Sequence, residues 1–160
     1  GQMLMAFGLI YVLWVLVWID ALHQILPDVL TLGLLWSGLL LHACLSPIEL
    51  ANAIFGVALG YLILWLPHVL YLKWRGVAGL GLGDCKLLAA IGAWMGAQSV
   101  PYVLLLASVL GLSFGVAWTL YRKRTDPSMA QMSVVNVRIA FGPFIAAAAF
   151  CMLIVQPNII

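Results

Sequence analysis

Long apolar runs separated by short polar breaks make up almost the whole chain. The runs are rich in Leu, Ala, Val and Gly and lack the alternation of apolar and polar residues that is typical of strands, so they favour helices. The pattern therefore predicts an all-α, polytopic membrane protein with about six transmembrane helices in a single domain, 1–160. The predicted helices cover about 4–19, 29–45, 48–72, 84–97, a fifth that follows the turn at 98–101 and ends near 121, and 139–155.

The composition strengthens the prediction of a membrane protein. Of the 160 residues, 66% are hydrophobic and only 8% are charged, whereas a soluble domain has roughly 45–50% apolar and 25% charged residues. Cys44, Cys85 and Cys151 form no CxxC pair, so neither a zinc site nor a disulfide framework is expected. His42 and His68 lie in different runs without clustered partners. The sequence thus predicts no metal, no cofactor and no nucleic-acid partner.

Small and polar residues inside the third predicted helix indicate how it packs. Gly56 and Gly60 form a GxxxG pair, which is typical of helices that approach each other closely. Asn52 lies one turn earlier and is expected to donate a hydrogen bond to another helix.

The positions of the basic residues predict the orientation in the membrane. Every basic residue follows an odd-numbered predicted helix: Lys73, Arg75, Lys86, Arg122, Lys123, Arg124 and Arg138. By the positive-inside rule these segments face the cytoplasm, so both termini are expected on the periplasmic side. Asp20 closes the first predicted helix and Asp84 opens the fourth. Both carboxylates are therefore expected at the cytoplasmic surface of the membrane.

Two carboxylates at the same depth are a candidate catalytic pair. Like charges split the titration of such a pair, so that one carboxyl stays protonated near neutral pH while the other is a base. In an aspartic protease the base activates a water molecule and the acid protonates the carbonyl oxygen of the peptide bond. Charge positions alone leave ion transport and helix capping open, since membrane aspartates also serve these roles.

Three segments of the chain resemble one family of membrane proteases. Residues 81–84, Gly-Leu-Gly-Asp, resemble the GxGD signature of intramembrane aspartyl proteases. The longer segment 83–96 resembles the type IV prepilin peptidases, also called prepilin leader peptidases. Residues 20–40 resemble the first aspartate motif of that family, and Phe141-Gly-Pro-Phe144 resembles its late Phe-Gly-Pro segment. The segments occur in the family's order.

The resemblance implies an aspartic endopeptidase of the bacterial inner membrane. Such an enzyme removes the short basic leader from type IV prepilins or pseudopilins, after a glycine and before an apolar helix, and so serves type IV pili or type II secretion. Carried over by motif, the catalytic residues are Asp20 and Asp84, with Asp28 as the substitute for Asp20. Large members also carry a cysteine-rich N-terminal region linked to methylation; this sequence has no CxxC pair, so the resemblance does not support methyltransferase activity.

Four residues are predicted to support the pair. Gly81 and Gly83 are expected to keep the loop before Asp84 slim and mobile. Lys86 is expected to orient the site or touch the substrate rather than Asp84, because residues two apart on a helix point to different faces. Asp28 is expected to act in a turn and helix cap. The expected partners are a prepilin and the lipid bilayer, and the oligomeric state stays open.

Two other functions remain as alternatives. One is another GxGD protease, such as an archaeal preflagellin peptidase, which an exchange of substrates would distinguish. The other belongs to a different class: a small ion-coupled transporter that uses Asp20 and Asp84 as ion ligands, which would bind ions without cleaving a peptide.

Overall fold

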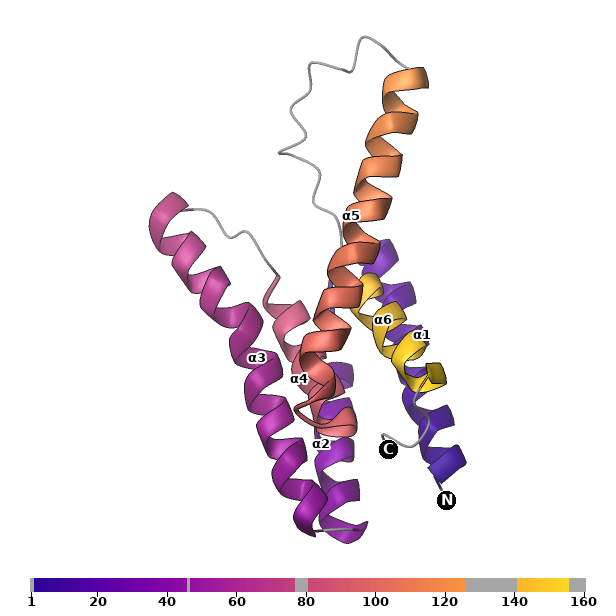
Figure 1. The fold of residues 1–160 in the computed structure, drawn as a ribbon, viewed down its shortest axis with the longest axis vertical. Helices are drawn as coiled ribbons and strands as arrows, with labels where there is room; N and C mark the ends of the chain where they lie inside the picture. Colours follow the sequence, from indigo (N-terminus) through magenta and orange to yellow (C-terminus); the bar gives the residue numbers. More distant parts are fainter. Residues whose placement is uncertain (1, 46, 77–80, 126–140, 156–160) are drawn as a thin grey trace.

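A computed structural model of the chain contains six α-helices (Figure 1). It describes all residues except 1, 46, 77–80, 126–140 and 156–160, and the side chains of 2–6, 45, 47 and 122–125 are likewise outside the description. The helices are α1 (Gln2–His23), α2 (Asp28–Leu45), α3 (Pro47–Arg75), α4 (Leu82–Met95), α5 (Ser99–Thr125) and α6 (Gly142–Val155). Within the described residues no strand occurs, so the predicted all-α class is confirmed.

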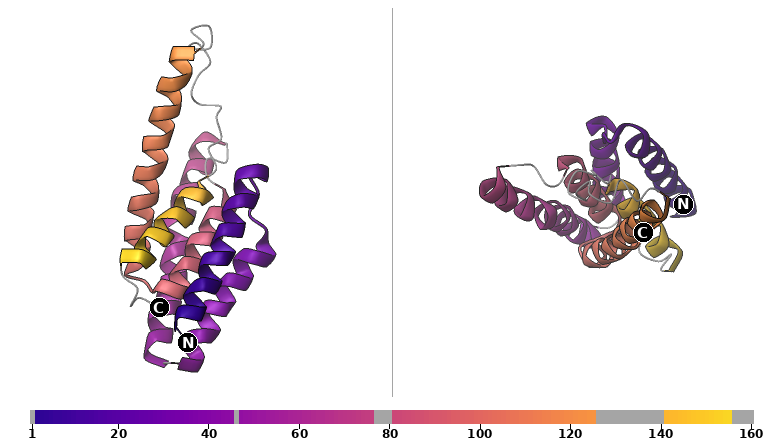
Figure 2. Two further views of the ribbon diagram at one scale, coloured as in Figure 1. Left: turned by 90° about the vertical axis from the view of Figure 1, so that its right-hand side faces the viewer. Right: turned by 90° about the horizontal axis from the view of Figure 1, so that it is seen from above.

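Successive helices alternate in direction and surround the short helix α4. In Figure 1, α1, α3 and α5 run upward and α2, α4 and α6 run downward. The two views of Figure 2 agree that α4 lies inside the bundle, and it contacts α2, α3, α5 and α6. All of its residues are buried except Leu82, Gly83 and Lys86. The element that follows the glycine-rich loop is therefore the centre of the core.

Small residues bring the backbones of α3 and α4 into direct contact. A Cβ atom on Gly56 would overlap the carbonyl group of Gly92, and one on Gly60 would lie 2.6 Å from the carbonyl oxygen of Leu88. The close packing predicted at Gly56 and Gly60 is therefore confirmed. The hydrogen bond of Asn52 differs from the prediction of a donor between helices: its Oδ1 accepts the backbone N–H of Ala97, in the connection between α4 and α5, at 3.1 Å.

Two helices are long and apolar enough to cross a membrane. They are α3 over Ile48–Arg75 and α5 over Ser99–Tyr121; at 1.5 Å per residue each exceeds the hydrocarbon thickness of about 30 Å. The described apolar stretches of α1, α2 and α6 are shorter, at 10–17 residues. Large apolar side chains are exposed on the outer surface of the bundle, including Trp14, Trp18, Trp36, Phe55, Leu105 and Leu112. The number of six spans and the side of the termini stay predictions.

Some predicted helix ends are wrong by a few residues. Helix α1 continues through Ala21 and Leu22, so Asp20 lies on the helix instead of after it. Gln24 ends this helix with a left-handed φ of 52° while its N–H donates to the carbonyl of Asp20. Helix α5 begins before Pro101, because proline is tolerated in a first turn, where its missing N–H needs no partner. The start of the last predicted span, at 139, lies outside the described residues.

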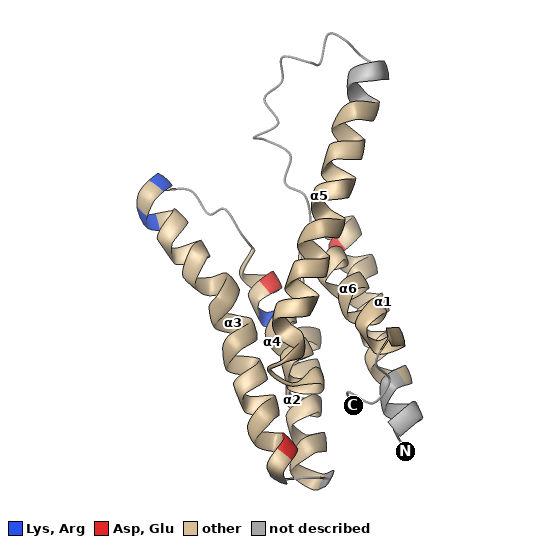
Figure 3. Cartoon of the chain, in the orientation of Figure 1, with Lys and Arg blue, Asp and Glu red and all other residues tan. Residues whose placement is uncertain are grey.

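The charges of α3 separate by sign along its length. Glu49 lies in its first turn, whereas Lys73 and Arg75 lie in its last turn. Figure 3 shows this separation, with blue at the upper end of α3 and red at the lower end. Of the other basic residues, the side chains of 122–124 and 138 lie outside the described part of the chain.

Candidate active site

Asp20 and Asp84 are both buried, although they come from helices that are far apart in the sequence. Only 5% of Asp20 and 8% of Asp84 is exposed. Asp20 lies in the last turn of α1 and Asp84 in the first turn of α4. Asp20 lies close enough for its charge to act on Asp84. The structure therefore brings together the two carboxylates that the sequence singled out.

The glycines before Asp84 shape the start of α4. Gly81 occupies the N-cap position with an extended backbone, and its carbonyl accepts the N–H of Asp84 at 3.2 Å. Asp84 is therefore not the N-cap of α4, so the alternative that it serves only as a helix cap is wrong. A Cβ atom on Gly81 would lie 3.5 Å from Oδ2 of Asp84, so this carboxylate folds back over the helix start.

Burial makes Asp84 hard to ionise. The residue lies in the first turn of α4, outside the two helices that meet the length criterion for a membrane span. Burial, and to a smaller extent the charge of Asp20, raises the pKa of Asp84 from 3.8 to about 7. Near neutral pH this carboxyl can therefore hold a proton while its neighbour is ionised, which is the state that general acid–base chemistry by a pair of carboxyls requires.

Leu26 packs between Gly83, which precedes Asp84, and Gly142, which contacts Asp20. It belongs to the short connection between α1 and α2. Its Cβ lies 3.0 Å and its Cδ1 3.1 Å from the position that a Cβ on Gly83 would take. The same Cδ1 lies 3.4 Å from the corresponding position on Gly142. Leu26 therefore crowds the space beside Gly83, whereas its distance at Gly142 is that of an ordinary contact.

Gly142, the first residue of α6, touches Asp20 directly. A Cβ atom there would overlap Oδ2 of Asp20. Burial raises the pKa of the Asp20 carboxyl, and the backbone N–H of Gly142, acting toward its negative charge, offsets part of that rise. Among the described residues, Oδ2 of Asp20 has no hydrogen-bond partner of ordinary geometry. The carboxylate is thus enclosed by the first residue of α6, whose amide acts on its charge without a hydrogen bond of ordinary geometry.

Lys86 and Asp28 lie together, apart from the buried pair. Nζ of Lys86 donates to Oδ1 of Asp28 at 2.6 Å, which ties α4 to the first turn of α2. The Asp28 side chain is 60% exposed. Asp20, rather than Asp28, is therefore the carboxylate enclosed beside Asp84.

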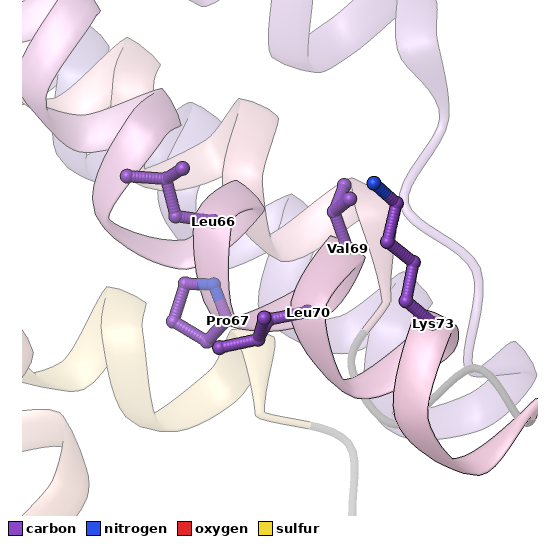
Figure 4. A pocket seen from close by; sticks show the side chains of 5 residues that line it. All are labelled: Leu66, Pro67, Val69, Leu70 and Lys73. Carbon is purple, nitrogen blue, oxygen red and sulfur yellow. The ribbon is translucent and has the colours of Figure 1, made fainter.

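No second pair of buried carboxylates occurs elsewhere in the described part of the chain. A shallow depression on α3 is lined by Leu66, Pro67, Val69, Leu70 and Lys73 (Figure 4); one cation and no acid lie in it. No group of three or more His, Cys, Asp or Glu residues suited to a metal ion occurs within the described residues. Nε2 of His42 lies 3.3 Å from the carbonyl oxygen of Trp94, so this buried histidine joins α2 to α4.

Replacing Asp84 by asparagine is expected to stabilise the folded protein in alkaline solution. The folded-state pKa of about 7 exceeds the unfolded value of 3.8. The buried Asp84 therefore does not lower the free energy of unfolding at a pH below 3.8, where the carboxyl is protonated in both states. It lowers that free energy most at a pH above about 7, where the buried carboxyl must ionise. The thermal unfolding midpoint of Asp84→Asn in detergent should therefore exceed that of the wild type at pH 8, and the difference should nearly vanish at pH 4. Asp28→Asn, which makes the same chemical change on an exposed side chain, is the control. A lower midpoint for Asp84→Asn at pH 8 would contradict the burial argument.

Gly83→Ala is expected to destabilise the protein through Leu26. The added methyl group would lie 3.0 Å from Cβ of Leu26, and overpacking of this kind costs about 1–3 kcal/mol. Leu26→Ala keeps Cβ but removes Cδ1, at 3.1 Å, and frees the backbone of Leu26 to shift, so Gly83→Ala should cost less, though still something, in the Leu26→Ala background. Thermal unfolding of the two single variants and the double variant measures this coupling, and strictly additive effects would refute the proposed contact.

The sequence reasoning missed the contacts of Leu26 and Gly142 with the site. Gly142 had one signal, its place in the Phe141-Gly-Pro-Phe144 segment, but nothing in the segment indicated that it faces Asp20. Leu26 had no signal, because a leucine between two apolar helices is unremarkable in such a chain.

Comparison with known proteins relates the chain to leader peptidases. The model of the type IV leader peptidase family matches residues 7–116, which include both buried aspartates. The prepilin leader peptidase/N-methyltransferase of Aeromonas salmonicida is 40% identical over 151 residues, covering 94% of this chain and 49% of that protein. Its namesake in Pseudomonas aeruginosa is 42% identical over 136 residues (85% and 44%), and that of Escherichia coli K12 is 41% identical over 128 residues (80% and 52%). The chain spans about half the length of these curated relatives. No solved structure matches it.

Proposed function

Because this chain belongs to the type IV leader peptidase family, we propose that it is a membrane endopeptidase that removes the short basic leader of type IV prepilins or pseudopilins. The relatives named above are called prepilin leader peptidases, which supports this substrate class. The proposal concerns cleavage alone; the methyltransferase activity in the relatives' names is not carried over.

The observation that carries the proposal is the pair of buried carboxylates at the ends of α1 and α4. Asp20 and Asp84 form the catalytic dyad, with one carboxyl ionised and the other protonated. The ionised carboxylate takes a proton from water, and the oxygen of that water attacks the carbonyl carbon of the scissile bond. The protonated carboxyl gives its proton to the carbonyl oxygen. When the tetrahedral intermediate collapses, the C–N bond breaks and the leaving amine takes a proton.

In the proposed arrangement the chain crosses the bacterial inner membrane several times and the site lies at its cytoplasmic surface. The last turn of α3, with Lys73 and Arg75, lies at the upper end of the bundle in Figure 1, where α1 ends and α4 begins. Basic residues favour the cytoplasmic side. The start of α1 and the end of α6 lie toward the opposite end, in keeping with termini in the periplasm.

This placement suits the substrate class. A basic leader stays in the cytoplasm while the apolar helix that follows it enters the bilayer, so the bond between them lies at the membrane surface. Gly81 and Gly83 add no side chains of their own beside Asp84, so a substrate that displaced Leu26 could approach the backbone there. The exposed pair of Lys86 and Asp28 forms the rim of the site next to α2.

The experiment is cleavage of a purified prepilin by the purified chain in liposomes of bacterial phospholipid. Mass spectrometry should find one cut, after the glycine that ends the leader. The rate should not change on addition of EDTA, because no step of the proposed mechanism uses a metal ion. Failure to cut prepilins and pseudopilins while cutting a preflagellin would favour the archaeal type of activity. Ion-dependent binding without any cleavage would favour transport and overturn the proposal.

A further inference from the structure

The start of α6 encloses one of the two carboxylates and not the other. Gly142 begins α6, and a Cβ atom on it would overlap Oδ2 of Asp20 and lie 3.4 Å from Cδ1 of Leu26. The first N–H groups of a helix have no partner within the helix and carry partial positive charge. Pro143 has no N–H, and those of Phe144 and Ile145 donate to the carbonyl of Phe141, so the amide of Gly142 is the one left for a partner outside the helix. An unpaired carboxylate oxygen, in a residue only 5% exposed, lies against this glycine.

Burial raises the pKa of the Asp20 carboxyl, and the start of α6 opposes that rise. The backbone N–H of Gly142 stabilises the negative charge of the carboxylate and offsets part of the cost of burying it. Helix α6 has no acidic, basic or histidine residue over Gly142–Val155 that would compete for this carboxylate. Asp84 of α4 is the titratable neighbour whose charge is coupled to it among the described residues.

Asp84 lacks the same support. It also lies in the first turn of a helix, but no hydrogen bond reaches its carboxylate among the residues that the structure describes. The backbone N–H of Asp84 donates to the carbonyl of Gly81 instead. Burial and the charge of Asp20 both oppose ionisation, in keeping with a pKa of about 7 for Asp84.

We propose that Gly142 is a positioning residue that holds Asp20 as the ionised member of the pair, so that Asp20 activates the water and Asp84 supplies the proton. This assignment rests on the proposed protease function. Asp20 takes a proton from water as the new C–O bond forms, and the proton of Asp84 moves to the carbonyl oxygen. As the C–N bond breaks, Asp20 gives its proton to the leaving amine and Asp84 recovers a proton from the intermediate's hydroxyl group. Both carboxyls return to their starting states.

The pH profile of cleavage tests this assignment through Gly142→Ala. The added methyl group must push the Asp20 carboxylate away from the amide, so ionisation of the base should require a higher pH. The acidic limb of kcat/KM for leader cleavage should move upward by about one pH unit, with the alkaline limb in place. Gly111→Ala is the matched control: its methyl group would lie at ordinary distances of 3.4 Å and 3.6 Å from the rings of Phe141 and Phe144, and it should move neither limb. An unmoved acidic limb in an active Gly142→Ala protein would overturn the proposal.

A stability cycle with Asp20→Ala tests the contact itself, even where Gly142→Ala is inactive. Gly142→Ala should lower the thermal unfolding midpoint in the wild-type background because the methyl group meets the carboxylate. In the Asp20→Ala background the carboxylate is gone, and the loss should shrink by at least half. An equal loss in both backgrounds would overturn the positioning role.

Failure of this inference and failure of the proposed function are distinguishable. Absence of cleavage by the wild-type chain would defeat the protease assignment, whereas the stability cycle would still report whether Asp20 and Gly142 are coupled. Normal cleavage with additive stability effects would defeat the role of Gly142 alone.

Discussion

Replacing Asp20 or Asp84 by asparagine is expected to abolish leader cleavage while the chain stays folded. Asparagine has nearly the shape of aspartate, but at neutral pH it neither takes a proton from water nor donates one as an acid. A positioned general acid or base contributes roughly 10²–10⁴-fold to a rate, so each variant should lose at least that range. The measurement is the rate of leader release from a purified prepilin, with circular dichroism of each variant recorded to establish that it is folded.

Asp28→Asn is the matched control for this experiment. It makes the same chemical change eight positions from Asp20, but on an exposed side chain that pairs with Lys86. Exposed ion pairs contribute about 0–1 kcal/mol, so this variant should cleave within a few-fold of the wild type. If Asp28→Asn abolished cleavage and Asp20→Asn kept it, the first catalytic carboxylate would be Asp28.

Gly92→Ala is expected to cause a large loss of stability. A Cβ atom on Gly92 would overlap the carbonyl group of Gly56 and lie 3.1 Å from a methyl group of Val100. A backbone carbonyl in the middle of α3 cannot turn aside as a side chain can, so α3 and α4 must separate along their length. Overpacking costs about 1–3 kcal/mol and occasionally more, and this position belongs at the upper end of that range. Thermal unfolding in detergent at a single scan rate measures the effect.

Gly33→Ala is the control for Gly92→Ala, since a Cβ on Gly33 meets no atom within 4 Å. Both variants place alanine in a helix, where alanine is favoured over glycine by roughly 1 kcal/mol. Gly33→Ala should therefore leave the midpoint unchanged or raise it. An equal response of the two variants would show that the contact of Gly56 with Gly92 does not limit the packing of α3 on α4.

The helices were predictable because their signals are local. A run of apolar residues specifies a helix through its composition, whatever lies elsewhere in the chain. The predicted helix ends were less accurate, because a single residue gives only a weak indication of where a helix stops. The charge of Asp20 suggested a helix end, but Ala21 and Leu22 continue the helix to His23. Pro101 suggested a turn, whereas a first turn tolerates proline.

The residues of the candidate site were predictable to different degrees. Asp20 and Asp84 stood out because charge is rare in apolar segments, and the positions of the basic residues paired them by predicting that both lie at the same depth. The ion pair of Lys86 with Asp28 did not stand out, since 58 residues separate the partners and each had a plausible role of its own. Gly142 stood out only as part of a motif, because its task depends on which side chain packs against it.

The amino-acid sequence by itself determined the helical class, the apolar character of the helices and the two candidate carboxylates. These follow from composition, periodicity and the cost of placing charge among apolar residues, all of which act over one or two helix turns. Only the tertiary structure decided that Asp20 is enclosed by Gly142, that Leu26 packs between Gly142 and Gly83, and that Asp84 is buried at the start of the central helix. These contacts join segments as much as 122 residues apart. They depend on how close two backbones come, a distance that the packing of the whole bundle sets.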